Sequence, residues 1–169
     1  MGNNLTLRIA GIEKESVCDG PGIRFTVFAQ GCFHRCKGCH NPQTHDPTGG
    51  YDITVGELLE MIDANPLLDG ITLSGGEPFL QAGVLAGFAA ECRNRGLSVM
   101  TYTGYLYEDI LKSENTDWHE LLRQIDILVD GPFIRERATP ERPFCGSSNQ
   151  RVLELKMVDS QSLNRPWSK

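Results

Sequence analysis

The chain has 169 residues and a formal net charge of −6. This length suits one domain with a substantial core, and the acidic balance argues against a nucleic-acid-binding protein, because such proteins normally present a basic surface. No apolar run approaches the roughly 20 residues that cross a bilayer, and residues 1–10 lack the layout of a secretory signal. We therefore expect one soluble, cytoplasmic domain over 1–169, with no membrane association and a tail from about residue 159 that could be flexible.

Two strands are predicted near the start of the chain. Apolar and polar residues alternate with a period of two over residues 5–12 and again over 23–29, which is typical of strands. The composition of residues 19–22 (DGPG) predicts a turn between them. The second strand leads directly into a loop with three cysteines, so we expect that loop at the carboxyl end of a strand.

Helices and further strands alternate in the rest of the sequence. Thr54 and Glu57 have the spacing of a capping box, and the apolar face that follows predicts a helix ending at Asn65. Apolar spacing predicts two more helices, over residues 81–95 and 118–125. Short strands are expected over 70–73, 98–101, 126–129 and 152–157.

The order of these elements predicts the fold class. A strand, a loop and a helix repeat about four times, which favours parallel pairing with right-handed crossovers. A complete barrel takes about 250 residues, so we predict an α/β fold in the form of an open, partial (β/α) barrel with a parallel sheet and helices on the outside. In such folds the loops after the strands carry the site. Four unusual motifs, CxxxCxxC, SGGEP, YTGY and VDG, all follow predicted strands, and we expect them to converge.

A candidate metal centre lies in the first of these loops. Cys32, Cys36 and Cys39 fall within eight residues, and three thiolates on such a loop can bind one metal centre. A zinc site would need a fourth ligand from elsewhere in the chain. A 4Fe-4S cluster usually takes four thiolates, so three would leave one iron open. The spacing alone does not distinguish the two metals.

The SGGEP motif is a second candidate binding element. Gly75 and Gly76 remove two side chains at a strand end, so main-chain groups there can contact a bound molecule. A phosphate-binding loop usually adds a basic residue, whereas Glu77 and Pro78 follow here. The available acceptors favour a cationic ligand, and an ordinary turn is the alternative.

Taken together, these motifs resemble those of a known family. The three cysteines followed by SGGEP at residues 74–78 resemble the radical S-adenosylmethionine (radical SAM) superfamily. The flanking motifs are similar to those of the glycyl-radical activases that act on anaerobic ribonucleoside-triphosphate reductase, and the resemblance spans roughly residues 17–152. These motifs are DGPGIR at 19–24, CHNP at 39–42, YTGY at 102–105, LVDG at 128–131 and GSSNQ at 146–150.

The resemblance implies a cofactor set and a reaction. Cys32, Cys36 and Cys39 would hold three irons of a 4Fe-4S cluster, with S-adenosyl-L-methionine on the fourth. The residues implied to contact S-adenosylmethionine are Gly38, His40, Gly75, Gly76, Glu77 and Thr103. One electron from reduced flavodoxin or a similar donor would cleave S-adenosylmethionine to a 5′-deoxyadenosyl radical, which would take a hydrogen atom from a glycine of the reductase. No side chain is implied as a catalytic acid, base or nucleophile, because the cofactor carries the chemistry.

One departure from the family pattern leaves other functions open. Cys145 stands before GSSNQ where arginine is usual, and it could be a fourth cluster ligand that closes the site. Such a closed cluster would make the protein an electron carrier. Apart from this departure, the alternatives to the activase are a non-catalytic iron-sulfur or zinc module, an activase of the formate-lyase type, and a small-molecule radical enzyme such as a deazapurine synthase. GSSNQ argues against the last two.

Several reactive side chains have simpler interpretations. Cys92 lies on the apolar face of a predicted helix and is expected to be buried, and Cys18 is expected to be a surface thiol. His34 is expected to face solvent. Asp130 could line the pocket or a cation site, or it could bond its own backbone in a turn. The charged run over 135–142 is expected to be a solvated loop, with partner docking as the alternative.

Overall fold

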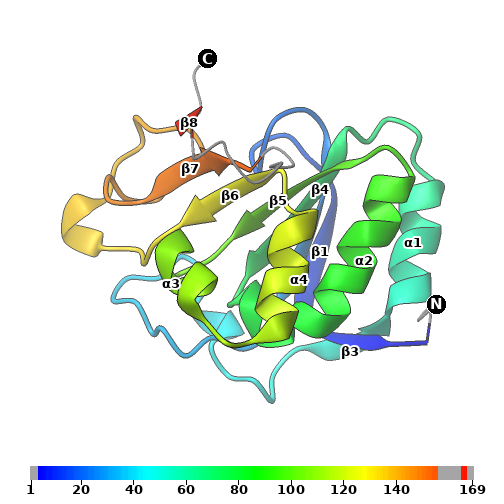
Figure 1. Cartoon of the computed structure of the whole chain (residues 1–169), viewed down its shortest axis with the longest axis horizontal. Helices are drawn as coiled ribbons and strands as arrows, with labels where there is room; N and C mark the ends of the chain where they lie inside the picture. Colours follow the sequence, from blue (N-terminus) through cyan, green and yellow to red (C-terminus); the bar gives the residue numbers. More distant parts are fainter. Residues whose placement is uncertain (1–3, 156–164, 167–169) are drawn as a thin grey trace.

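A single eight-stranded sheet runs through the molecule in the order β3-β1-β2-β4-β5-β6-β7-β8 (Figure 1). The computed structural model describes residues 4–155 and 165–166. Four central strands pair in parallel: β2 (Arg24–Ala29), β4 (Gly70–Gly75), β5 (Ser98–Tyr102) and β6 (Ile127–Asp130). The flanking strands pair antiparallel: β1 (Thr6–Ser16), β3 (Tyr51–Thr54), β7 (Arg151–Glu154) and β8 (Arg165–Pro166).

The predicted α/β class is confirmed, but the sheet is mixed rather than parallel. Among the described residues, four of the seven strand pairs are antiparallel. The connection from β1 to β2 spans only residues 17–23, which is too short for the crossover that parallel neighbours need. The two strands therefore form a hairpin, and the prediction of an all-parallel sheet was wrong at both edges.

Helices cover one face of the sheet. Figure 1 shows α1 (Val55–Asp63), α2 (Ala82–Asn94) and α4 (Thr116–Gln124) side by side over this face. Their buried faces and the strands beneath form the main core, whose largest fully buried side chains include Phe25, Phe79, Phe88, Leu58 and Leu85. The capping box predicted for α1 is confirmed, since Thr54 Oγ1 accepts from the Glu57 amide at 3.1 Å.

Five short elements were not predicted from hydrophobic periodicity. They are β3, the helix α3 (Tyr107–Lys112), and the 3₁₀ turns η1 (Pro42–Thr44), η2 (Pro78–Gln81) and η3 (Arg135–Arg137). Each spans at most six residues, too few for a period of two or of 3.6 to be recognised. The expected tail from about residue 159 lies outside the described residues, except for β8.

The second face of the sheet carries a smaller cluster. Met100, Val129 and Cys145 are buried there, on the side opposite the helices because neighbouring strand residues point to opposite faces. The loop between β1 and β2 packs on this face so closely that a Cβ on Gly20 would lie 2.8 Å from the Met100 sulfur. Within the described residues, no helix is long and apolar enough to cross a membrane.

A buried arginine joins the strands on this second face. The Arg24 side chain is fully buried and donates to the hydroxyls of Ser98 and Thr72 at 2.6 and 3.1 Å. Burial lowers its pKa to about 10. Arg24 therefore links β2, β4 and β5 at their amino ends, away from the loops described next.

Candidate functional site

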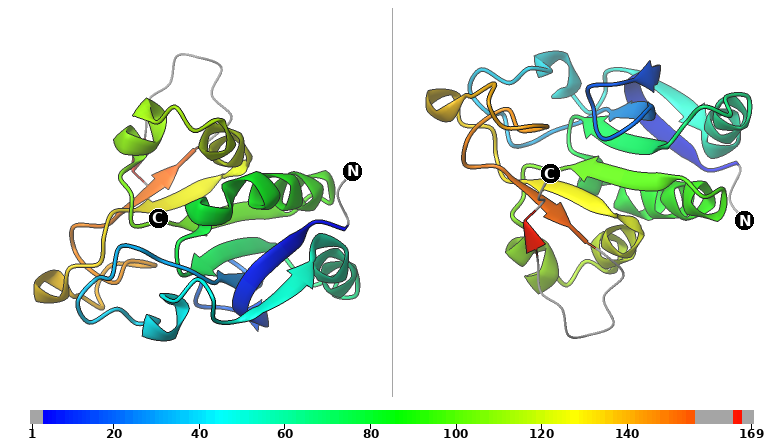
Figure 2. Two further views of the ribbon diagram at one scale, coloured as in Figure 1. Left: turned by 90° about the horizontal axis from the view of Figure 1, so that it is seen from below. Right: turned by 90° about the horizontal axis from the view of Figure 1, so that it is seen from above.

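Loops that follow four neighbouring strands converge at one end of the sheet, as the sequence predicted. The Gly76 amide after β4 donates to the Ala29 carbonyl at the end of β2, at 2.8 Å. The Thr103 amide after β5 donates to the Val129 carbonyl of β6, at 2.9 Å. Figure 2 shows the pale-blue loop after β2 beside the gold segment after β6, at the same end of the molecule.

The first of these loops carries the three cysteines. Cys32 is buried, whereas Cys36 and Cys39 are partly exposed, and all three are free thiols. The loop is closed at its base by the Cys32 amide, which donates to the His45 carbonyl at 3.1 Å. Within residues 4–155, no three His, Cys, Asp or Glu side chains are arranged as a ready metal site. The thiols therefore share one loop but do not form a preassembled ligand set.

The chemistry of this loop nevertheless fits an iron-sulfur cluster. Burial, the largest influence, raises the pKa of the Cys32 thiol, and backbone amides of His34 and Arg35 act against that rise. The Asn41 amide donates to the Cys39 sulfur at 3.4 Å. Amide groups aimed at sulfur stabilise bound thiolates and tune iron-sulfur clusters. Three such thiols, none of them in a disulfide, are a suitable donor set for three irons.

The two glycines of SGGEP allow a close approach of backbone to backbone. A Cβ on Gly76 would lie 2.3 Å from the Gly31 carbonyl oxygen, and one on Gly75 would lie 2.6 Å from the Ala29 nitrogen. Gly75 also has a φ of +91°, which other residues rarely adopt. The space that a side chain would fill is occupied by β2 and the start of the cysteine loop. Backbone packing therefore requires both glycines, independently of any ligand.

Glu77 is a buried hydrogen-bonding centre between three loops. Its carboxylate is 1% exposed and accepts from four groups of the protein. These are the His34 ring at 2.8 Å, the Gly104 amide at 2.9 Å, the Thr103 hydroxyl at 3.0 Å and the Phe79 amide at 3.0 Å. Glu77 and Thr103, both expected at the ligand, thus contact each other and join the loop after β4 to the loop after β5.

His34 does not face solvent, so that prediction was wrong. Its side chain is only 20% exposed, and its ring lies 4.5 Å from the ring of Tyr105 in an edge-on arrangement. Gly104 makes room for it, since a Cβ there would lie 2.5 Å from the imidazole. The ring is held in place by residues some 70 positions later in the chain, which sequence spacing could not reveal.

Gly38 and His40 place the other end of the cysteine loop against the segment after β6. A Cβ on Gly38 would lie 3.0 Å from the side chain of Arg135. The ring of His40 lies 4.9 Å from that of Phe133, and a Cβ on Gly146 would be 3.4 Å from the His40 ring. The sequence did not predict Phe133 and Arg135 at the site. No sequence motif identifies these two residues, because their contacts form only where the cysteine loop meets the segment after β6.

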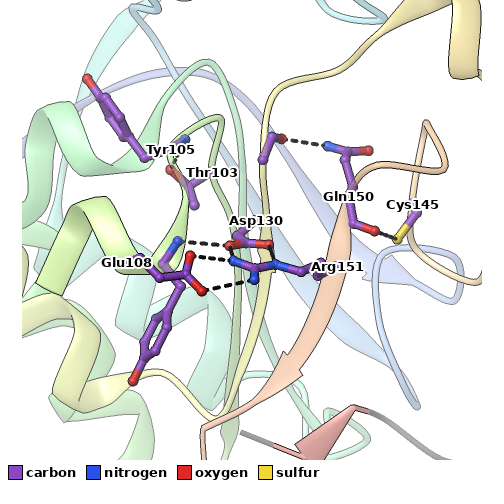
Figure 3. A network of polar contacts seen from close by, with 9 residues as sticks. Thr103, Tyr105, Glu108, Asp130, Cys145, Gln150 and Arg151 are labelled. Carbon is purple, nitrogen blue, oxygen red and sulfur yellow. Dashed lines mark hydrogen bonds and ion pairs between the residues drawn. The ribbon is translucent and has the colours of Figure 1, made fainter.

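Asp130 takes part in an ion pair rather than in either expected arrangement. The carboxylate is fully buried and accepts from Arg151 Nε at 2.9 Å and from the Tyr107 amide at 2.8 Å. Arg151 in turn binds Glu108 (Figure 3). Asp130 therefore neither bonds its own turn nor offers a free carboxylate to a cation.

Cys145 and GSSNQ form a structural turn. The Cys145 thiol is buried against Met100 and Val129, and its sulfur donates to the Gln150 carbonyl at 3.8 Å (Figure 3). The Gln150 side chain accepts from the Gly146 amide at 2.8 Å and donates to the Gly131 carbonyl at 3.0 Å. These contacts, with Met100, Val129 and the Gln150 carbonyl, favour a structural role for Cys145 over that of a fourth cluster ligand.

The remaining cysteines lie where the sequence predicted. Cys92 is fully buried on α2, and burial raises its pKa to about 12. Cys18 is exposed on the turn before β2. Neither thiol lies on the cysteine loop.

Comparisons with known proteins find an iron-sulfur family and similar activating enzymes. Residues 18–153 match the family described as a 4Fe-4S single cluster domain. An anaerobic ribonucleoside-triphosphate reductase-activating protein of Vibrio cholerae is 35% identical over 146 residues, covering 80% of this chain and 90% of that protein. A pyruvate formate-lyase-activating enzyme of Clostridium pasteurianum is 43% identical over 114 residues, covering 62% and 48%. The crystal structure of QueE from Escherichia coli gives a TM-score of 0.44 at 17% identity, covering 59% and 52%, too slight a likeness to bear on the fold.

Proposed function

The chain belongs to the family of anaerobic ribonucleoside-triphosphate reductase-activating proteins, which carry a 4Fe-4S domain, and we propose that it installs a glycyl radical on that reductase. One observation carries this proposal. The similarity extends over 90% of the V. cholerae relative, and this chain carries three free thiols on one loop at the carboxyl end of β2. The protein is accordingly a radical SAM enzyme that uses a 4Fe-4S cluster and S-adenosylmethionine.

Each part of the convergent site would have a distinct task. Cys32, Cys36 and Cys39 would hold three irons, leaving the fourth for S-adenosylmethionine. When bound, the reduced cluster and S-adenosylmethionine supply a radical that removes a hydrogen atom from the target glycine. Gly38 and His40 would lie against S-adenosylmethionine, in the region where the cysteine loop meets the segment after β6.

The SGGEP glycines, Glu77 and Thr103 would serve mainly to hold the loops of the site in position. The amides of Gly76 and Glu77 are already used by Ala29 and Gly31, so a ligand would meet the carbonyls of Gly75 and Gly76. Such acceptors suit the amino group of S-adenosylmethionine. Glu77 and Thr103 would orient the loops around the ligand, because their polar atoms are bonded to each other.

We also propose that the sheet is the wall of an open, partial (β/α) barrel formed by one domain over 1–169. Two features support this arrangement. The three consecutive parallel pairs from β2 to β6 are joined by segments that include α1, α2 and α4 on a single face. The other face has its own buried cluster around Met100 and is covered by the loop between β1 and β2.

The proposed electron donor is reduced flavodoxin or a similar acidic carrier in the cytoplasm. Exposed basic side chains lie on the cysteine loop and on the segment after β6 that meets it at Gly38. In the part of the chain described, none of them forms an ion pair: Arg35, Lys37, Arg135, Arg137 and Arg142. Elsewhere, five arginines are paired with carboxylates: Arg8, Arg93, Arg95, Arg123 and Arg151. Unpaired bases on an acidic protein favour an acidic partner at this end.

An activase of the formate-lyase type remains the second candidate. The C. pasteurianum relative has the higher identity, although this chain covers only 48% of its length. GSSNQ, which seemed to argue against this function, is bonded within the fold through Gln150 and so says little about the partner. The two candidates differ only in the glycyl radical protein that is activated.

Anaerobic reconstitution tests the proposal. We expect a brown protein with about four irons per chain that forms 5′-deoxyadenosine with a reductant. It should also produce a glycyl radical signal on anaerobic ribonucleoside-triphosphate reductase but not on pyruvate formate-lyase. Tight zinc binding with no 5′-deoxyadenosine would instead support a non-catalytic metal module.

A further inference from the structure

The middle of the cysteine loop is tied to the rest of the described chain by one hydrogen bond. Residues 33–38 form no other hydrogen bond to described residues outside the loop, and this one joins His34 Nε2 to Glu77 Oε2 at 2.8 Å. The remaining hydrogen bonds of the loop lie at its base, as at Cys32, or within it, as between the Cys39 amide and the Cys36 carbonyl. The placement of Cys36 relative to the sheet therefore depends strongly on one side-chain contact.

Glu77 is well suited to anchor this contact. Three further donors, from Thr103, Gly104 and Phe79, hold its carboxylate at 2.9–3.0 Å, and the residue is 1% exposed. A carboxylate fixed in this way does not need to move when His34 binds. Because the acceptor is ionisable and buried, its hydrogen bond to His34 is stronger than one between neutral groups in water.

The partner ring is equally constrained. Gly104 leaves a gap that the imidazole fills, with its Cδ2 2.5 Å from the position of a Cβ there. Tyr105 closes the other side, 4.5 Å between ring centroids. Both neighbours belong to the loop after β5, so the contact sets the cysteine loop against two other loops of the site at once.

We propose that Glu77 and His34 form a latch that fixes the cysteine loop in its cluster-binding position. In this role Glu77 is a positioning residue that acts through His34, rather than a direct contact of S-adenosylmethionine. The inference rests on the proposed function, because it assumes that the loop carries a cluster. The latch gives a specific role to Glu77 of the SGGEP motif and to His34, which lies between Cys32 and Cys36.

The test compares His34→Leu with His34→Gln in the reconstituted full-length protein. His119→Leu is the matched control, since the His119 ring also makes one hydrogen bond, donated to the Ser113 carbonyl at 2.7 Å, but lies on α4. We expect His34→Leu to lose iron to EDTA about tenfold faster than wild type, the change expected for one hydrogen bond to a charged group. The EPR spectrum of its reduced cluster should also respond differently to S-adenosylmethionine. His34→Gln should recover both properties, because its amide can still donate to Glu77.

Several outcomes would overturn the latch. One is a His34→Leu protein that retains iron and its EPR spectrum like wild type; another is a His34→Gln protein as labile as His34→Leu. A melting temperature of the metal-free protein that falls far more in His34→Leu than in His119→Leu would instead assign the contact to general stability.

A measurement without metal separates the latch from the proposed function. Amide hydrogen exchange of residues 32–39 in the metal-free, full-length protein should become faster in His34→Leu but not in His34→Gln or His119→Leu. If wild type binds no cluster, the proposed function fails while this experiment still decides whether the latch exists. Equal exchange in all four proteins would reject the latch even if the cluster forms.

Discussion

Arg151 of β7 binds the buried carboxylate of Asp130 on β6 with two of its nitrogens. Nε lies 2.9 Å from Oδ1, and Nη2 bonds Oδ2 (Figure 3). The same guanidinium also bonds both carboxylate oxygens of Glu108 on α3, at 3.0 and 2.8 Å. One arginine therefore joins the antiparallel strand β7, the central strand β6 and the helix that follows the YTGY loop.

Replacing Arg151 with methionine should destabilise the protein strongly. The substitution would leave the fully buried Asp130 carboxylate with only the Tyr107 amide. Removing one partner of a buried ion pair costs about 3–5 kcal/mol, and we expect about 3 kcal/mol here because the Arg151 side chain is 40% exposed. Urea unfolding of the metal-free protein measures the loss.

Arg123→Met is the control for this substitution. Arg123 and Glu120 form an ion pair in which the side chains are 63% and 57% exposed, and such surface pairs contribute about 1 kcal/mol or less. Equal losses in the two variants would show that the Arg151 pair is no more important than a surface pair.

The same network predicts how stability depends on pH. Hydrogen bonds from Arg151 lower the pKa of Glu108 from 4.5 to about 2. As the pH falls below 4.5, the unfolded chain therefore takes up this proton before the folded protein does, and the stabilisation present above pH 4.5 is lost progressively towards pH 2. Glu108→Gln should flatten the dependence of the unfolding free energy on pH in this window.

Salt provides a check on the assignment to Glu108. The side chain is 47% exposed, so 0.5 M salt should weaken the effect in wild type. The carboxylates of Asp63 and Glu57 also have lowered pKa values, through Arg95 and Thr54 respectively. The unfolding free energy of both wild type and Glu108→Gln should therefore keep some dependence on pH. If the unfolding free energy of Glu108→Gln depended on pH as strongly as that of wild type, Glu108 would not contribute to the pH dependence.

Features that depend on neighbours in sequence could be predicted. The Thr54 and Glu57 capping box involves residues three apart, and the burial of Cys92 follows from the apolar stripe of one helix. The convergence of the four motifs also follows from the rule that loops after parallel strands share one end of a sheet. These inferences need no knowledge of which distant segments touch.

Features that depend on distant segments could not be predicted. His34 bonds a glutamate 43 residues later and fills a gap at Gly104, and nothing near His34 in the sequence distinguishes this from exposure to solvent. The direction of β7 was missed for a similar reason. Alternation of apolar residues predicts a strand but carries no information about whether it runs parallel or antiparallel to its neighbour.

Gly76→Ala should destabilise the metal-free protein. The new Cβ would lie 2.3 Å from the Gly31 carbonyl oxygen, so β4 would have to move away from β2 and weaken the hydrogen bond from the Gly76 amide to Ala29. We expect a loss of about 2 kcal/mol or more, as for other backbone clashes in packed regions. Urea unfolding measures it.

The matched control is Gly87→Ala on the exposed side of α2. Nothing lies within 4 Å of a Cβ at this position, and alanine is favoured over glycine in a helix by about 0.5–1 kcal/mol. The two glycine substitutions should therefore change stability in opposite directions. A neutral Gly76→Ala would mean that the glycine serves only a ligand.

Cys145→Ala should leave cluster chemistry unchanged. Its thiol is buried against Met100 and Val129 and bonds the Gln150 carbonyl, contacts that assign it a structural role. Reconstituted Cys145→Ala should contain as much iron as wild type and form 5′-deoxyadenosine at a similar rate, whereas Cys36→Ala should lose both. Increased 5′-deoxyadenosine formation in Cys145→Ala would indicate that Cys145 closes the cluster in the native protein.

Charge reversal near the cysteine loop should impair electron delivery by an acidic protein. The test variant combines Lys37→Glu on the cysteine loop with Arg137→Glu on the segment after β6. The control combines Lys14→Glu with Lys112→Glu, which makes the same change in charge at two exposed lysines of β1 and α3. Association steered by charge can be accelerated 10-fold or more at low salt. We therefore expect reduced flavodoxin to reduce the cluster of the first double variant about 10-fold more slowly at low salt, with little difference at high salt. Dithionite should reduce both variants equally, and equal reduction by flavodoxin would remove these bases from the donor interface.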